Sequence, residues 1–588
     1  MAVAEPTLVP ARRQKLLTAR AADIVTICCI VLALWLVYFR AIPYIGLYND
    51  DYYNVGFPAS LSFSEVWNQC VSWMLHWPNG RPLSACLGWM AAYVLVHIGG
   101  LHAIYLLPFT LVAVNSYLIY YLVSRRTSPL TGFMAAIAFG ISPVDTLRLQ
   151  YTVTFQYQAC IVVTLAAFVL YERGKHGLAY LTLFCSLLFH ECAVLGFLAA
   201  PILVVPWRRM PRELARNAII VGCIIAAVLF ARAAMMNESR TQSAMTNAGT
   251  MLRRSLESAT TGTATHIQLL ESRAIQSLTR PLLPQLSGTL LGLLVLLGCA
   301  MILIAGSVRF AAGVNVKEVL SALKREDRPP PEFWMGCARV FAAGLIIFFF
   351  NYLVFFLDPY HPANHIAGMV GLVHTAPGIG AAFCIAVIGA SLIAGLGMLE
   401  LRFIGLAVML IFLSALGAWG SVIRGQYEQA WTNEQLFWKN VTTLVPDASD
   451  GTIIIVEVAR PFDLPYTWVI GSNSWADTIA TRMVYRCSWN NPPRLYLLPP
   501  SWGDRVQNRN GELDWMVPQT LGLAGWEPLP QGNVVVLQAN NGVLTRLPGP
   551  LSMPQGELRL KPPPAPGVRA SLSDGIVRRY LLPAESHR

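Results

Sequence analysis

Long apolar stretches recur along this 588-residue chain, and they constrain its fold more than any other feature. Each is about 20 residues long, the length that an α-helix needs to cross the hydrocarbon core of a bilayer. Hydrophobic residues make up 55% of the chain and charged residues only 13%, a composition outside the range of soluble domains. We therefore expect a polytopic α-helical membrane protein of about eleven spans, near residues 22–42, 103–123, 129–143, 156–171, 178–190, 192–206, 217–235, 285–308, 337–357, 371–396 and 403–422.

Basic residues between these stretches indicate the orientation of the spans, because Lys and Arg concentrate on the cytoplasmic side of a membrane. Eleven spans place every basic cluster inside, with the amino terminus inside and the carboxyl terminus outside. This holds if residues 82–98 lie in or dip into the outer leaflet, since a further crossing would move Arg125 and Arg126 outside. The clusters explain the net charge of +11 without a nucleic-acid partner; they are Arg12/Arg13/Lys15, Arg125/Arg126, Arg173/Lys175, Arg208/Arg209/Arg212/Arg216, Lys317/Lys324/Arg325/Arg328 and Arg402.

Composition divides the chain into three parts. Residues 1–21 are predicted to be a cytoplasmic tail, and the first apolar stretch has no small-residue cleavage site, which favours an uncleaved anchor. Residues 22–423 form the membrane domain, with outer loops at 43–102 and 236–284. Residues 424–588 have no further span, and we expect one extracytoplasmic domain of mixed α/β structure.

Two kinds of segment are expected in this last domain. An amphipathic helix is predicted at about 426–445. Runs rich in β-branched residues at 452–458 and 533–539 predict strands.

An acid pair follows the first span in the sequence YNDDYY, residues 48–53. Two adjacent carboxylates at a membrane boundary are costly unless they contact water, a cation or a substrate. We expect Asp50 and Asp51 to be catalytic, with one of them taking a proton from an acceptor. Tyr53 is a candidate for binding the substrate. The alternatives are a helix cap or a bound divalent cation.

Two further outer segments carry ionisable groups. Arg81 opens the apolar segment 82–98 just after His76, and a guanidinium at a helix amino terminus is suited to phosphate binding. His190 and Glu191 lie within apolar sequence, where an ionisable pair is a functional candidate by default. A simple hydrogen bond between these two side chains at a hairpin turn is the alternative.

Two more loops face the same side in this topology. Tyr360 and His361 lie between Pro359 and Pro362, and His365 follows; all three are candidates for binding phosphate or sugar hydroxyls. A zinc site there is disfavoured, because the prolines break helical spacing and no fourth ligand stands out. Arg148, with Asp145 and Gln150, forms a weaker set after the third span.

These features together resemble the GT-C superfamily of integral-membrane glycosyltransferases, which includes protein O-mannosyltransferases and lipid A aminoarabinose transferases. The resemblance is carried by Asp50-Asp51 in the first outer loop, by the following Arg81-Pro82-Leu83, by Glu191 in the middle hairpin and by the carboxy-terminal outer domain. His190 stands where relatives often have Lys, and the WWD signature of oligosaccharyltransferases is missing from the sequence.

The resemblance implies an inverting hexosyl or pentosyl transfer from a polyprenyl-phosphate-linked sugar to a glycan, lipid or protein acceptor outside the cytoplasm. Asp50 would then be the general base, and Asp51 would assist with the acceptor or a metal. No cofactor is required in this scheme. The bilayer is a partner, and a bacterial inner membrane is the favoured location.

Three alternatives remain at this stage. A lipid-linked glycan polymerase or ligase would use Arg240, Arg253, Arg254 and His266 in the loop 236–284. A transporter or flippase would show inverted repeats and broken midplane helices. A scaffold would use the outer domain for binding only.

Overall fold

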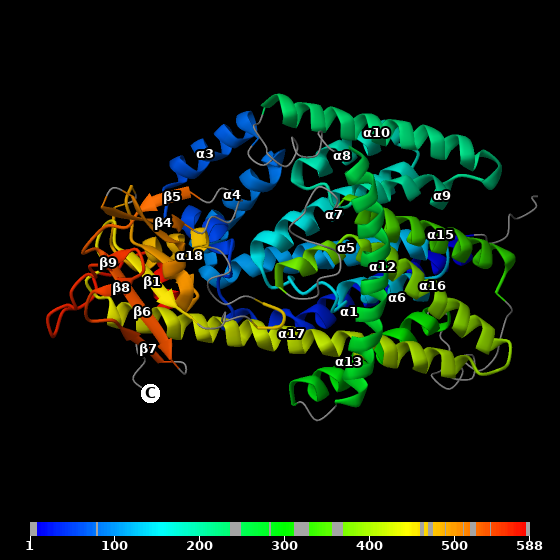
Figure 1. The fold of residues 1–588 in the computed structure, drawn as a ribbon. Helices are drawn as coiled ribbons and strands as arrows, with labels where there is room; N and C mark the ends of the chain where they lie inside the picture. Colours follow the sequence, from blue (N-terminus) through cyan, green and yellow to red (C-terminus); the bar gives the residue numbers. More distant parts are fainter. Residues whose placement is uncertain are drawn as a thin grey trace, which may run out of the picture.

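The computed structural model describes residues 9–77, 80–235, 248–280, 284–310, 329–354, 368–458, 464–467, 474–488, 490–509, 511–517, 525–540 and 543–583. These residues form a bundle of long helices with a strand-rich domain at one end (Figure 1).

Nine helices in the described part of the chain are long and apolar enough to cross a membrane. Three shorter apolar helical segments add to them: α6 (Pro129–Gly140), α8 (His176–Phe189) and the joined η5 and α9 (Val194–Val204). Every predicted span falls on one of these helices, so the predicted polytopic helical architecture is confirmed. The long helices are α1 (Val9–Val37), α4 (Pro82–Gly99), α5 (Leu106–Ser124), α7 (Tyr151–Glu172), α10 (Met210–Met235), α13 (Pro284–Phe310), α15 (Pro331–Leu353), α16 (Pro377–Gly397) and α17 (Arg402–Leu444).

Basic clusters that are far apart in the sequence meet at one end of the bundle. Arg126, just after α5, forms an ion pair with Glu172 at the end of α7, with 3.0 Å between Nη2 and Oε1. Arg339 in α15 donates from Nη1 to the Val205 carbonyl after α9 at 2.9 Å. The strand-rich domain lies at the opposite end (Figure 1). We call these the basic end and the domain end.

Helix α4 is long enough to cross a membrane, yet both of its ends lie near the domain end. Arg81, which precedes it, contacts Glu191 after α8, and α8 begins at the basic end. Beyond its last turn, the Leu101 N–H donates to the Tyr580 hydroxyl of α19 (Ile576–Leu581) at 3.3 Å. With α3 (Phe63–His76) it forms a helical hairpin (Figure 1). Since α4 is one of the nine helices long and apolar enough to span, the expectation that residues 82–98 do not make a separate crossing stays a prediction.

A long helix, α12 (Ala248–Thr279), occupies most of the region predicted as an outer loop at 236–284. It lies across the long helices (Figure 1) and packs on α15 and α17. Its buried face carries polar residues such as His266 and Arg273. Leu256, Ile267 and Leu278 are exposed on one flank of its outer side.

Helix α17 is unbroken over 43 residues, or about 64 Å at 1.5 Å per residue. It unites the predicted last span, 403–422, with the helix predicted separately at 426–445. No proline interrupts it. Since a bilayer core is about 30 Å thick, its second half extends into the strand-rich domain.

The strand-rich domain is built on a four-stranded sheet of order β2-β1-β6-β7. The central β1 (Ile453–Glu457) pairs in parallel with β2 (Arg494–Leu498) and β6 (Val534–Asn540), and β7 (Val543–Arg546) closes a hairpin. Helix α18 (Ser474–Val484) connects β1 to β2. The two segments predicted as strands are β1 and β6, so both predictions are confirmed. The other strands are β3 (Val506–Arg509), β4 (Glu512–Val517), β5 (Gly525–Pro528), β8 (Leu551–Met553) and β9 (Gly556–Leu558).

Short helices link these elements. They are η1 (Phe39–Tyr44), η2 (Tyr52–Gly56), α2 (Phe57–Ala59), η4 (Leu101–Tyr105), η6 (Trp207–Arg209), η8 (Gly368–His374) and η9 (Pro500–Arg505).

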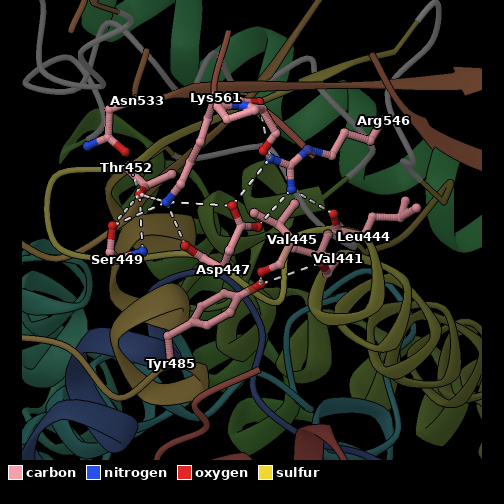
Figure 2. Close-up of polar contacts among 11 residues, drawn as sticks. Val441, Leu444, Val445, Asp447, Ser449, Thr452, Tyr485, Asn533, Arg546 and Lys561 are labelled. Atoms are coloured by element: carbon pink, nitrogen blue, oxygen red, sulfur yellow. Dashed lines mark hydrogen bonds and ion pairs between the residues drawn. The ribbon is translucent and has the colours of Figure 1, made fainter. Parts of the chain in front are cut away.

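Arg546 of β7 connects the sheet to the carboxyl end of α17 through hydrogen bonds and an ion pair. Its Nη1 donates to the Leu444 carbonyl at 3.0 Å and to Asp447 Oδ1 at 2.8 Å. Lys561 donates from Nζ to the Asp447 carbonyl at 2.6 Å (Figure 2). These cations satisfy carbonyl groups that a helix end leaves without partners, and they complement its negative dipole.

Replacing Arg546 with Ala should destabilise this junction by roughly 2–4 kcal/mol, because Asp447 and the end of α17 lose a cation whose side chain is only 6% exposed. Thermal unfolding in detergent and limited proteolysis between residues 445 and 583 measure the effect. Arg559→Ala removes an exposed arginine of the same domain and serves as the control. Equal stability of the two variants would contradict the assigned role.

Candidate functional site

The acid pair lies in a tight turn after the first span. The Asp51 N–H donates to the Tyr48 carbonyl at 3.0 Å, and Asn49 adopts a φ of +50°. Asparagine tolerates this left-handed conformation better than most residues do, so the sequence favours a turn here. The turn directs the two carboxylates into different environments, with Asp51 buried and Asp50 partly exposed.

Asp51 caps the amino terminus of α7. Its Oδ1 accepts from the Thr152 N–H at 2.8 Å and from the Thr152 hydroxyl at 2.6 Å. Its Oδ2 accepts from the Tyr151 N–H at 3.2 Å and from the Tyr48 N–H at 3.4 Å. The start of a helix has free N–H groups and a positive dipole, so it stabilises a carboxylate. The helix-cap alternative raised by the sequence therefore describes the geometry of Asp51.

The buried carboxylate is also unusually basic. Burial raises the pKa of Asp51 to about 7, although the hydrogen bonds from Thr152, Tyr151 and Tyr48 lower it. Both oxygens already accept hydrogen bonds, which leaves little capacity for a divalent cation. No group of three His, Cys, Asp or Glu side chains in the described residues is arranged to hold a metal ion. A cation at Asp50 and Asp51 stays a prediction.

Two further chain segments, the end of the loop before α7 and helix α17, pack around this turn. Gln150 donates from Nε2 to the Tyr48 carbonyl at 3.4 Å, and Tyr48 donates its hydroxyl to the Tyr427 carbonyl of α17 at 2.8 Å. The Tyr52 hydroxyl donates to Glu434 Oε1, also in α17. Glu434 is buried and was not singled out from the sequence, since 382 positions separate it from Tyr52.

A second charged cluster joins α4, the turn after α8, and α10. Arg81 contacts Glu191 with both ends of its guanidinium, and Nε lies 3.2 Å from Oε2. Arg232 of α10 also donates to Glu191 Oε2, at 3.4 Å, and to the Gly80 carbonyl at 3.1 Å. Burial raises the pKa of Glu191, but the charges of Arg81, His190 and Arg232 outweigh it and hold the pKa well below its usual range. Arg232 was not predicted from the sequence.

His190 sits beside this cluster without a close bond to Glu191. Its Nδ1 accepts from the Cys192 N–H at 3.2 Å and lies 3.9 Å from Glu191 Oε2. The ring packs against Tyr157 of α7 with 4.1 Å between centroids. The sequence suggested a hydrogen bond between the side chains of His190 and Glu191 as an alternative. In the structure, His190 Nδ1 instead accepts from the backbone N–H of Cys192.

Helix α7 relates the two clusters to each other. The Tyr151 N–H binds Asp51, and the Tyr151 hydroxyl donates to the Gly88 carbonyl of α4 at 2.9 Å. Tyr157, which packs on His190, lies about 9 Å farther along the same helix, given 1.5 Å per residue. The acid turn, α4 and the His190-Glu191 turn thus converge on the first half of α7.

Other candidates take different places. Arg148 is buried and donates from Nη2 to the Phe139 carbonyl at 2.7 Å, so it binds the end of α6. Tyr53 stacks on Phe57 with 5.9 Å between rings, and His76 is exposed with Nδ1 2.8 Å from the Ser72 carbonyl. Roles of Arg148, Tyr53 and His76 in substrate binding stay predictions. Tyr360, His361 and His365 lie outside the described residues.

The residues of the polymerase alternative are spread over different environments. His266 is buried in α12, with Nδ1 2.9 Å from the Tyr352 hydroxyl, which in turn lies 2.6 Å from His374 Nδ1. Arg253 is exposed and paired with Glu257 on the same helix. Arg240 lies outside the described residues.

Comparison with known proteins gives the site no relative. No family model, no curated protein and no solved structure matches this chain.

The raised pKa of Asp51 predicts a pH-dependent stability. Between the ordinary carboxyl pKa of about 4 and the folded value of about 7, the folded state binds more protons than the unfolded state. The contribution of Asp51 to the free energy of unfolding should therefore decrease as pH rises from about 4 to 7 and stay constant above 7. Thermal midpoints from pH 5 to 8 test this, with Asp51→Asn expected to lose the slope and Asp50→Asn expected to keep it. Parallel curves for native protein and Asp51→Asn would contradict the prediction.

Glu191→Gln should destabilise the protein by about 2–3 kcal/mol, because Arg81 and Arg232 lose their shared anion. The value is below that of a fully buried pair, since the Arg81 side chain is 22% and that of Glu191 16% exposed. Adding Arg232→Met to Glu191→Gln should recover part of the lost stability, because it removes one of the two guanidiniums left without their anion. Chemical unfolding in detergent measures both, with Glu213→Gln at an exposed ion pair as the control. The prediction is wrong if Glu191→Gln and Glu213→Gln are equally stable.

Proposed function

We propose that this chain is a GT-C-type membrane glycosyltransferase that transfers a sugar from a polyprenyl-phosphate donor to an acceptor at the domain end. The supporting observation is the convergence on α7: the acid turn, the α4 hairpin and His190 all contact its first half. These are the segments on which the resemblance to that superfamily depends. A transferase of this type needs its acid and its donor-binding groups in one region at a membrane boundary, and this packing meets that need.

Asp50 is proposed as the general base, because it is the partly exposed acid of the pair. It would take the proton of an acceptor hydroxyl as the acceptor oxygen bonds to the sugar C1. The bond between C1 and the phosphate oxygen breaks, and the phosphate leaves with the electron pair, so the configuration at C1 inverts. Asp51, fixed at the start of α7, positions the turn that carries Asp50.

The domain end is proposed to face the outside of the cytoplasm. Arg126 and Arg339 lie at the other end, and basic residues favour the cytoplasmic side. The acceptor would then enter from the aqueous phase, and the donor from the outer leaflet of a bacterial inner membrane. A sugar, lipid or protein acceptor fits this scheme equally.

Asp50→Asn should reduce transfer at least about a hundredfold, in the range that general bases contribute, while the protein still inserts. Membranes carrying native or variant protein at matched expression are given radiolabelled sugar, and the labelled polyprenyl-phosphate pool and the product are extracted in parallel. The native protein should deplete the labelled lipid, and the variant should accumulate it. Glu213→Gln, at the exposed pair of α10, is the matched control. Normal turnover by Asp50→Asn would overturn the assignment of the base, and an unchanged pool with native protein would favour a transporter or a scaffold.

A further inference from the structure

Four arginines are buried in the described part of the chain: Arg148, Arg232, Arg273 and Arg424. Three of them have a carboxylate partner, and the distances are 3.5 Å from Arg148 to Asp145, 3.4 Å from Arg232 to Glu191 and 3.2 Å from Arg424 to Glu428. Arg273 of α12 is 2% exposed and has no carboxylate partner among the described residues. A buried cation without an anion is costly, so this position calls for an explanation.

The contacts of Arg273 leave part of its guanidinium unsatisfied. Nη1 donates to the Pro143 carbonyl, and the guanidinium lies over the Tyr466 ring at 5.3 Å. Within the described residues, Nη2 has no hydrogen-bond partner. Ser277 lies one turn farther along α12, on the same face, and its buried Oγ also lacks a partner there. Arg273 Nη2 and Ser277 Oγ are therefore two buried donors, one helical turn apart, without an acceptor among the described residues.

A phosphate is the acceptor that this pair fits. Its oxygens accept several hydrogen bonds at once, and arginine binds phosphate through its planar fork. A carbonyl or hydroxyl would satisfy Nη2 but would leave the charge uncompensated. Arg81 is less available, because both ends of its guanidinium already contact Glu191.

The position of α12 indicates how the phosphate arrives. Leu256, Ile267 and Leu278 are 48%, 53% and 47% exposed on one flank, as expected for a helix that lies along a membrane interface. The opposite face buries Arg273 against the loop 141–150. The other end of this loop carries Gln150, which binds the acid turn. A lipid-borne phosphate bound under α12 would thus contact one end of the loop 141–150, and the acid turn contacts the other end.

We propose that Arg273 and Ser277 bind the phosphate group of the lipid-linked donor. This inference rests on the proposed function and assigns the leaving group of that reaction to α12 rather than to Arg81. The isoprenyl chain would extend past the exposed apolar flank of α12 into the bilayer. The bound phosphate would supply an anion for Arg273, which has no carboxylate partner among the described residues.

Binding can be measured on the purified full chain in an uncharged detergent by titration calorimetry with farnesyl phosphate, a short isoprenyl phosphate. Arg273→Gln should weaken binding by about tenfold to a hundredfold, the range for loss of a charge-assisted hydrogen bond. Ser277→Ala should weaken it severalfold. Arg253→Gln is the matched control on the same helix, because the Arg253 side chain is 81% exposed. Farnesol and inorganic phosphate, titrated separately, test the lipid and the anion alone.

Native affinity in a folded Arg273→Gln variant would overturn the proposal. If that variant does not fold, native affinity in Ser277→Ala would overturn it. Equal binding of inorganic phosphate would replace the lipid with a free anion, and equal binding of farnesol would show that the phosphate is not recognised; either result contradicts the assignment. Transfer of labelled sugar is scored separately. If the native protein binds farnesyl phosphate through Arg273 but transfers no sugar, the proposed function is wrong and the phosphate site stands. If Arg273→Gln transfers sugar at the native rate, the phosphate site is wrong and the proposed function stands.

Discussion

The hydrogen bonds between the Asp51 carboxylate and the first N–H groups of α7 hold together the part of the molecule on which every other assignment depends. One side chain ties the loop after the first span to the start of a helix 100 residues later. The same turn contacts α17 through the hydroxyls of Tyr48 and Tyr52. Because α17 continues into the strand-rich domain, the acid turn is mechanically connected to the sheet. Within this turn, the Asp50 carbonyl accepts from the N–H groups of Tyr53 and Asn54, which fixes the backbone that carries the Asp50 side chain.

Buried charge is distributed unevenly over the bundle. Near α7, Glu191 lies between two guanidiniums, and this cluster joins three helical segments. At the domain end of α17, Arg546 and Lys561 share Asp447. In these clusters each buried charge has a partner of opposite sign. Arg273 differs, since its charge has no counterpart in the described residues, and this contrast is why the phosphate site is proposed there.

Much of the fold follows from local sequence, whereas the site depends on distant contacts. Span positions and the strands β1 and β6 were predictable, because length and hydropathy are local properties. The predicted boundary at residue 424 reflects a change of composition. No proline interrupts the helix there, so α17 continues to Leu444. Asp51 was singled out as a residue, yet its role as a cap involves Thr152, which is 101 positions away. Arg232, Glu434 and Arg273 could not be predicted, because their importance arises only from partners in other helices.

The most direct test of this account is a cryo-electron microscopy map of the full chain in lipid nanodiscs with a polyprenyl-phosphate sugar bound. The account predicts phosphate density beside Arg273 under α12, with the sugar directed toward Asp50 and the isoprenyl chain along the exposed flank of α12. Density for the phosphate at the basic end of the bundle, or beside Arg81 with no phosphate at Arg273, would contradict it.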